Sequence, residues 1–107
     1  MTRTVDLVVE GGHGAALTPA VEAVKRGRRV LVVLRSGDAR PARKIRRRLG
    51  RAATAAEVPV TVLTNAEIVC VDGIGAVEAV VIRYRHSGRV CAVNASEFWS
   101  CEQVDSR

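Results

Sequence analysis

Aromatic side chains are nearly absent from this sequence of 107 residues, which has one Phe, one Trp and one Tyr. Proteins that bind single-stranded nucleic acid stack bases on aromatic rings, so this scarcity disfavours that class. No apolar run approaches the roughly 20 residues that cross a bilayer. The segment Met1 to Asp6 also lacks the apolar stretch of a secretory signal. We therefore expect a cytoplasmic chain with no membrane segment.

Cysteine is scarce as well, and its three positions, Cys70, Cys91 and Cys101, form no CxxC pair. The odd number and the wide spacing disfavour a disulfide framework, a zinc knuckle and a redox dithiol. No cluster of His, Cys and Asp has the spacing of metal ligands, so we expect no metal. The thiols are expected to be buried and to pack as small apolar side chains.

Acidic residues are few in one part of the chain. Between Lys25 and Arg51 the sequence places 12 of its 17 basic residues and only one of its 11 acidic residues, Asp38. Such a block indicates a polyanion, a phosphate-bearing ligand or an acidic partner protein. The alternative is a solvated helix face. Elsewhere the composition is ordinary, with 48% hydrophobic residues, and the length suits a single domain over residues 1–107.

The first half of the chain alternates strands and helices. Val5–Val9 and Val30–Leu34 are short apolar runs, typical of strands buried on both faces. Between them, Ala15–Arg26 has the apolar stripe of a helix, and Thr18 as N-cap with Pro19 at the first helical position is its favoured start. A right-handed βαβ crossover would make the two strands parallel neighbours.

A second helix follows the turn Ser36-Gly37-Asp38, with a thin apolar stripe that includes Ile45, Leu49 and Ala56 and a very basic opposite face. Segments rich in β-formers complete the chain: Val58–Leu63, Glu67–Val71, Val77–Arg85, Arg89–Val93 and a short final segment, Ser96–Cys101. The sequence therefore predicts an α/β fold, with three parallel strands, two crossover helices and an antiparallel β-meander.

This order resembles the nucleotide-binding domains of flavin- and NAD(P)-dependent oxidoreductases, especially the NADPH-binding domain of thioredoxin reductase and its relatives. The likeness rests on four segments: Val8–Ala16, Val30–Arg40, Val60–Val69 and Val77–Val93. It implies a Rossmann-like three-layer FAD/NAD(P)-binding fold and hydride chemistry in which NADPH reduces a flavin. The chain has neither a flavin domain nor a redox dithiol, so we do not expect a complete enzyme. We expect a module that works with a larger redox protein or as a homo-oligomer.

The glycine turn after the first strand is the candidate phosphate loop. A strand that turns sharply into a helix aims backbone N–H groups at a pyrophosphate when no side chain blocks its approach. The candidate residues are Gly11, Gly12, His13, Gly14 and Ala15. No register satisfies GxGxxG or GxGxxA, and Glu10 would repel a diphosphate. The alternative is a glycine turn kept only for close packing.

The residues at the end of the second strand indicate which nucleotide the site would bind. NAD and FAD sites place an acid there to accept the ribose hydroxyls, whereas this sequence has Leu34-Arg35-Ser36. The guanidinium groups of Arg35 and Arg40 match a phosphate, so the sequence favours NADP(H) over NAD(H) or FAD. The alternative for Arg35 is a solvated strand end.

Two other functions remain open. In the first, the chain is a degenerate docking or regulatory subunit that has lost nucleotide binding, and the ribbon edge Val77–Arg85 pairs with a partner strand. In the second, the helix over Arg40–Arg51 binds nucleic acid. The scarce aromatics and the missing reader motif disfavour nucleic acid as a partner.

Overall fold

The computed structural model of the protein describes residues 3–11, 17–37 and 39–100. These ranges contain two helices, α1 (Leu17–Lys25) and α2 (Ala39–Ala56). The strands, in chain order, are β1 (Arg3–Thr4), β2 (Leu7–Glu10), β3 (Val30–Val33), β4 (Val60–Leu63), β5 (Ala66–Asp72), β6 (Ala79–Tyr84), β7 (Val90–Asn94) and β8 (Glu97–Ser100).

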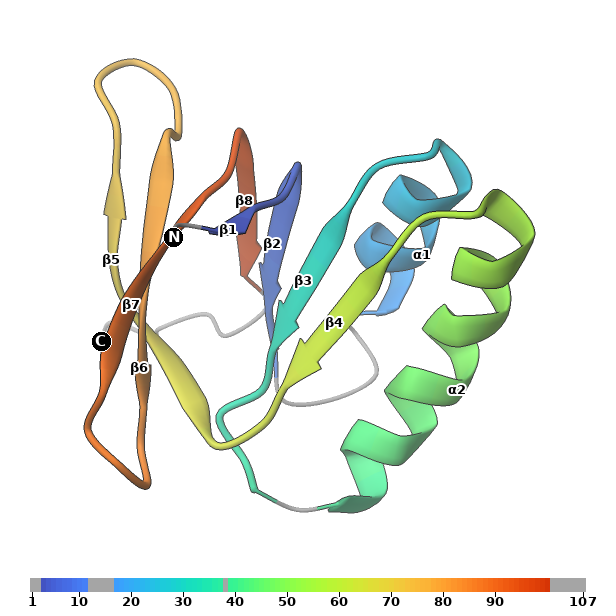
Figure 1. Ribbon diagram of the computed structural model, residues 1–107, viewed down its shortest axis with the longest axis horizontal. Helices are drawn as coiled ribbons and strands as arrows, with labels where there is room; N and C mark the ends of the chain where they lie inside the picture. The colour runs from blue at the N-terminus through green and yellow to red at the C-terminus, as the bar shows by residue number, and fades with distance from the viewer. Residues whose placement is uncertain (1–2, 12–16, 38, 101–107) are drawn as a thin grey trace, which may run out of the picture.

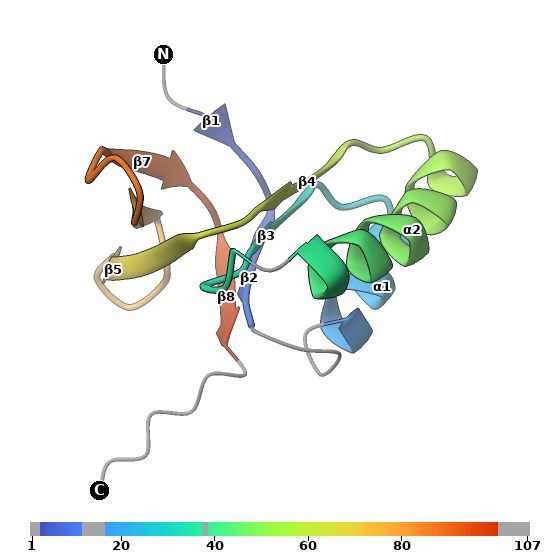
Figure 2. The same cartoon turned by 90° about the horizontal axis from the view of Figure 1, so that it is seen from below.

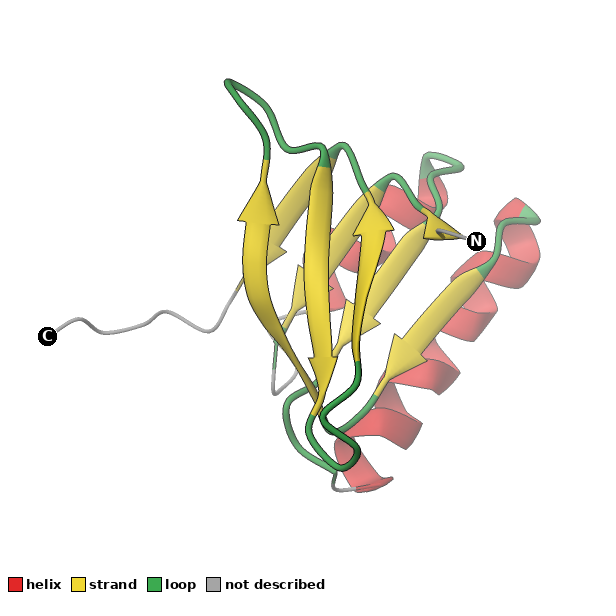
Figure 3. Cartoon of the chain, turned by 60° about the vertical axis from the view of Figure 1, so that its left-hand side comes forward, coloured by secondary structure: helices red, strands yellow, loops and turns green. Residues whose placement is uncertain are grey.

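The elements form three layers. A parallel sheet in the order β4-β3-β2-β8 lies in the middle, and α1 and α2 cover one of its faces (Figure 1). A second sheet, β1-β7-β6-β5, covers the other face, as the view from below and the side view both show (Figures 2 and 3). We refer to this second sheet as the meander sheet. The Rossmann-like α/β fold with a β-meander, expected from the sequence, is confirmed.

The two central strands are buried on both faces because both faces are covered. Along β2, Leu7 and Val9 point into the core beneath the helices, and Val8 points into the core beneath the meander sheet. Val8 and Val9 are fully buried. Leu7 pairs with Val30 in a parallel register, which confirms the predicted βαβ unit. Apolar side chains on both faces explain why these strands have unbroken apolar sequences.

The parallel sheet has one strand more than expected. β8, the final short segment, pairs in parallel with β2, with Leu7 opposite Glu97 and Glu10 opposite Ser100. The predicted strand Val5–Val9 also starts later than expected, because the residues before Leu7 are not part of the parallel sheet. β1 pairs with β7, and the N–H of Val5 donates to Asn94 O at 2.9 Å. The chain thus passes from one sheet to the other between Val5 and Leu7.

The bounds of α1 differ from expectation, since the described helix ends at Lys25 rather than at Arg26. α1 includes Leu17, so the prediction of Thr18 as the N-cap is wrong. Pro19 then lies in the first turn, where backbone N–H groups have no partner within the helix, so it does not break the helix. In α2 the predicted stripe is confirmed, since Ile45 and Leu49 are buried against the sheet. No helix in the described ranges is long and apolar enough to cross a membrane.

The meander sheet corrects two expectations. β6 pairs with both β5 and β7, so the predicted partner-binding edge Val77–Arg85 is wrong: β6 is an inner strand, and β5 lies at the edge. Cys70 of β5 is exposed rather than buried, because it lies opposite Val81 on the outward face. Cys91 is half-buried against the inner core, as expected of a small apolar side chain. Cys101 lies outside the described residues.

Candidate functional site: the carboxyl edge of the parallel sheet

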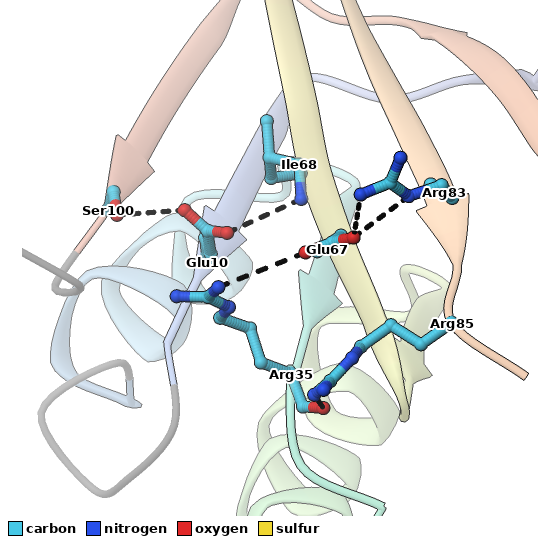
Figure 4. A network of polar contacts seen from close by, with 7 residues as sticks. All are labelled: Glu10, Arg35, Glu67, Ile68, Arg83, Arg85 and Ser100. Atoms are coloured by element: carbon cyan, nitrogen blue, oxygen red, sulfur yellow. Dashed lines mark hydrogen bonds and ion pairs between the residues drawn. The ribbon is translucent and has the colours of Figure 1, made fainter.

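The candidate site lies where β2, β3 and β8 end. Because the strands are parallel, their carboxyl ends meet at one edge of the sheet, and β5 of the meander sheet crosses close to it (Figure 4). The chain continues from β2 through α1 to β3 on one side, and β8 lies on the other side of β2. In open α/β sheets, ligands bind outside the carboxyl ends at such a reversal of strand order.

Glu10 is the last residue of β2, and its side chain lies on the face of the parallel sheet that the meander sheet covers. One carboxylate oxygen accepts a hydrogen bond from Ser100 Oγ at 3.1 Å, and the other accepts from the N–H of Ile68 at 3.4 Å (Figure 4). The side chain lies on the same face of β2 as Val8, which belongs to the meander core. Glu10 therefore connects β2, β5 and β8, and its carboxylate is directed toward the meander sheet.

Gly11 is the described part of the candidate phosphate loop. It is buried, and its N–H donates to Val33 O at 3.1 Å, which extends the pairing of β2 and β3 by one residue. This amide is therefore already hydrogen-bonded within the sheet. The other predicted loop residues, Gly12, His13, Gly14 and Ala15, lie outside the described residues.

Arg35 follows β3 at the same edge. Its side chain is 50% exposed, and its Nη2 atom lies 3.8 Å from Oε1 of Glu67. The backbone of Arg35 is held independently, because Nη1 of Arg85 donates to its carbonyl oxygen at 3.0 Å (Figure 4). The structure thus brings Arg35 next to two residues of the meander sheet and its turn.

Glu67 is the centre of this network, and its carboxyl group faces two arginines. Its Oε2 atom accepts a hydrogen bond from Nε of Arg83 at 2.9 Å and a second one from Nη2 of the same side chain. The hydrogen bond from Arg83 lowers the pKa of Glu67 below its ordinary value of 4.5. Burial opposes this shift, and the positive charges of Arg83, Arg35 and Arg85 add to it. Glu67 is therefore ionised at neutral pH.

Ser36 and Arg40, the remaining predicted residues, are exposed near this edge. The carbonyl oxygen of Ser36 accepts a hydrogen bond from the N–H of Asn65 at 3.1 Å, so the loop after β3 is fixed to the loop before β5. Arg40 lies in the first turn of α2, on a different element from Arg35. In the described residues no group of three or more His, Cys, Asp or Glu side chains is placed to hold a metal ion.

Sequence reasoning did not find Glu67, Arg83 or Arg85. They lie on β5, on β6 and just beyond β6, and they reach the edge only because the meander sheet folds back over the parallel sheet. In the sequence, Val80, Ile82 and Tyr84 alternate with Val81, Arg83 and Arg85, and this period of two indicates that Arg83 and Arg85 lie on one face of a ribbon. Nothing in the sequence indicated which part of the parallel sheet that ribbon meets.

The fold is shared with solved structures of flavin-type oxidoreductases. The thioredoxin reductase of Streptococcus pyogenes superposes with a TM-score of 0.69 at 22% identity, over 92% of this chain and 31% of that one. The myxobacterial chondrochloren halogenase, described as a new variant of the FAD-dependent halogenases, has a TM-score of 0.72 at 16% identity, over 98% and 38% of the two chains. For the bacillithiol disulfide reductase of Staphylococcus aureus the TM-score is 0.68 at 20% identity, over 92% and 29%.

These comparisons establish the fold class and no further property. The resemblance to thioredoxin reductases expected from the sequence is confirmed at the level of the fold, and this chain spans about a third of the length of those structures. No protein-family model matches the sequence, and no curated protein matches it significantly. One fold carries many chemistries, so the function of this chain depends on the residues of its site.

Proposed function

We propose that this chain binds NADP(H) at the carboxyl edge of its parallel sheet, as the nucleotide-binding part of a flavin-type redox assembly. The observation that carries the proposal is the place of Arg35. A half-exposed guanidinium stands at the end of β3, where sites for NAD and FAD have an acid. A planar guanidinium matches the 2′-phosphate of NADP(H) through paired hydrogen bonds.

The surroundings of Arg35 support a phosphate. The network of Figure 4 contains three guanidinium groups, those of Arg35, Arg83 and Arg85, and two carboxylates, those of Glu10 and Glu67, so it carries one excess positive charge. Glu67 is bound more closely by Arg83 than by Arg35. Paired hydrogen bonds from Arg35 to a phosphate, at about 2.8 Å, would therefore replace a weak contact of Arg35 with Glu67.

The rest of the nucleotide would lie along the turn after β2. The Gly11 amide is bonded to Val33, so contacts to the pyrophosphate would come from the predicted residues that follow it. When bound, the nicotinamide supplies the hydride chemistry. The residues of this chain bind and orient it, with Arg35 on the ribose phosphate and the fixed Ser36 backbone beside it. FAD is less favoured, since its adenosine ribose carries no 2′-phosphate for Arg35.

The proposed assembly includes a further redox protein or a second copy of the chain. Hydride transfer needs an acceptor such as a flavin, and the neighbours that share this fold are about three times as long as this chain. Cys70 and Cys91 are free thiols, which fits the reducing cytoplasm. This chain would therefore perform the binding step, and its partner would supply the electron acceptor.

Thermal-shift measurements with NADPH, NADH, FAD and AMP test the proposal. A ligand at 100 times its Kd stabilises the folded state by about 2.7 kcal/mol, so we expect NADPH to raise Tm clearly and NADH to raise it little. Arg35→Ala should remove the difference between NADPH and NADH. Arg89→Ala, which removes an exposed arginine of the β6–β7 hairpin, should keep it. A purified protein with flavin absorbance, or equal responses to NADPH and NADH, would overturn the assignment to NADP(H).

A nucleotide-free docking module is the second candidate. It is favoured by the engaged amide of Gly11 and by the carboxylate of Glu10 beside the predicted loop. Its docking edge would be β5, the outer strand of the meander sheet, rather than β6. The absence of any nucleotide response, together with co-purification of a larger redox protein, would favour this candidate over NADP(H) binding.

A further inference from the structure

The outward side of α2 carries an unusual concentration of positive charge. Ile45 and Leu49 define the side that packs on the sheet. On the other side, six exposed cationic residues recur mainly at spacings of three and four. We call them the α2 basic face: Arg43, Lys44, Arg46, Arg47, Arg48 and Arg51. Figure 2 shows α2 in the helix layer, on the side of the parallel sheet opposite the meander sheet. Arg46 and Arg48 lie at the margins of this face, since Nη2 of Arg46 donates a hydrogen bond to Val62 O of β4 at 3.3 Å and Arg48 lines a hollow with Glu22 and Lys25 of α1.

The charges of the α2 basic face are not balanced within the described part of the chain. None of the six residues forms an ion pair with a described residue, and α2 itself contains no Asp or Glu. Pairs such as Lys44 with Arg48 and Arg47 with Arg51 place like charges four residues apart, which destabilises a helix. The first turn of α2 also has no acid to match the positive end of the helix dipole.

We infer that the α2 basic face binds the phosphate backbone of a nucleic-acid duplex, independently of the proposed nucleotide site. A bound polyanion would remove the repulsion among these side chains. Five of the six are arginines, whose guanidinium groups pair with phosphates in a bidentate way. Arg46, Arg47 and Arg51 also line an open hollow over Gly50, and the side chains of Arg47 and Arg51 are exposed.

The composition of this face distinguishes a duplex from other polyanions. A protein partner would need an apolar or aromatic centre, and a membrane surface would need apolar anchors beside the cations. The outward positions of α2 offer neither, because Thr54 and Ala55 are the exposed residues that follow Arg51. Single strands require aromatic rings for stacking. The scarcity of aromatics therefore weighs against single strands and against base reading, but not against contacts to a duplex backbone.

The dimensions of α2 agree with a nucleic-acid duplex as the partner. A straight helix of 18 residues is about 27 Å long, and the major groove of B-DNA, about 12 Å wide, admits a helix. Duplex DNA carries one charge per about 1.7 Å of its axis, so phosphates are dense enough to meet every arginine of the face. Arg35 is outside this surface, so duplex binding does not depend on NADP(H) binding.

Fluorescence anisotropy with a labelled duplex of 20 base pairs tests the inference over a series of salt concentrations. The logarithm of the binding constant should fall linearly with the logarithm of the salt concentration, by about 0.9 per phosphate contacted. With four to six contacts, we expect a slope of about −4 to −5. Two duplexes of unrelated sequence should bind equally well, and a single strand of the same length should bind more weakly.

Two double variants with the same change in net charge locate the surface. Arg47→Gln with Arg51→Gln should make the slope about 1.8 units less steep, because two phosphate contacts are lost. Arg26→Gln with Arg89→Gln, two exposed arginines on other elements, should leave the slope unchanged. Since removing like charges relieves repulsion in α2, circular dichroism should show the first variant folded.

Three results would overturn the inference. One is no binding of the duplex at low salt, and a second is an equal loss in both double variants, which would reflect net charge alone. The third is tighter binding to phosphatidylserine vesicles, to polyglutamate or to the single strand than to the duplex. Each of these outcomes leaves the NADPH thermal shift unaffected, so the failure of this inference and that of the proposed function are distinguishable.

Discussion

Ser100 donates a hydrogen bond to the carboxylate of Glu10 across 90 residues of sequence, at 3.1 Å. Glu10 ends β2 and Ser100 ends β8, and the two residues are also register partners in the parallel sheet. The contact therefore fixes the carboxyl edge where the last strand joins the first strand of the βαβ unit. It is half-buried, so water screens it only in part.

Removing this hydroxyl should weaken the fold measurably. A hydrogen bond to a charged group contributes about 1.5–3 kcal/mol, and partial exposure reduces this, so Ser100→Ala should cost about 1–2 kcal/mol of unfolding free energy. The control is Ser87→Ala in the exposed β6–β7 hairpin, which should change stability by less than about 0.5 kcal/mol. Urea unfolding measures both variants. Equal losses in the two would show that the Glu10 contact contributes nothing special.

Glu67 should make stability depend on pH. Because the hydrogen bond from Arg83 lowers its pKa in the folded state, ionised Glu67 stabilises the fold above its ordinary pKa of 4.5. This contribution is lost as the pH falls through the lowered pKa. Glu67→Gln should therefore be less stable than the wild type at neutral pH, and the difference should shrink in acid.

Chemical unfolding at a series of pH values tests this prediction. Arg83→Gln removes the partner of Glu67 and should show the same pH pattern, and the double variant should add little to either single variant. A difference between wild type and Glu67→Gln that stays constant down to acidic pH would contradict the assigned cause, the ionised Glu67–Arg83 pair.

The packing of α2 gives a third stability test. Leu49 is fully buried between α2 and the sheet, so Leu49→Ala should leave a cavity and cost about 2–5 kcal/mol. Thr54→Ala, at an exposed position of the same helix, should change stability by less than about 0.5 kcal/mol. Thermal unfolding compares the two variants. A small loss for Leu49→Ala would mean that α2 does not pack as described.

Two glycines should respond to alanine in opposite directions. Gly50 lies inside α2, and an added methyl group there would contact nothing, so Gly50→Ala should stabilise the protein by about 0.5–1 kcal/mol. Gly27 has a φ of +79° after α1, which disfavours a side chain, so Gly27→Ala should cost about 1–2 kcal/mol. Changes of the same sign, measured by urea unfolding, would show that one of the two backbone conformations differs from the one described.

The sequence predicts the central part of the fold well, for a physical reason. Runs such as Val30–Leu34 are apolar on both faces because helices lie on one side and a second sheet lies on the other. The stripe through Ile45 and Leu49 likewise follows from helical spacing. Local patterns of this kind carry enough information to identify a strand or helix and the side that is buried.

Long-range placement is what the sequence does not provide. The short segment containing Phe98 does not indicate that β8 pairs with β2, because a strand of four residues pairs equally well with several edges. Glu67 reaches Arg35 through the fold of the meander sheet, over a separation that no periodicity measures. The part of the candidate site on β3 and at the turn after β2 was therefore predictable from the sequence, whereas the part on the meander sheet was not.

The position of β8 also determines the order in which this fold is completed on the ribosome. β2 has its neighbours at Val30–Val33 and at Glu97–Ser100, so one side of it stays unpaired until residues 97–100 have been synthesised. During that interval an apolar strand presents an open edge, which can recruit a strand from another molecule. Slow translation of the meander segment would lengthen this exposure, and chaperones that shield nascent strands would then matter most for the yield of folded protein.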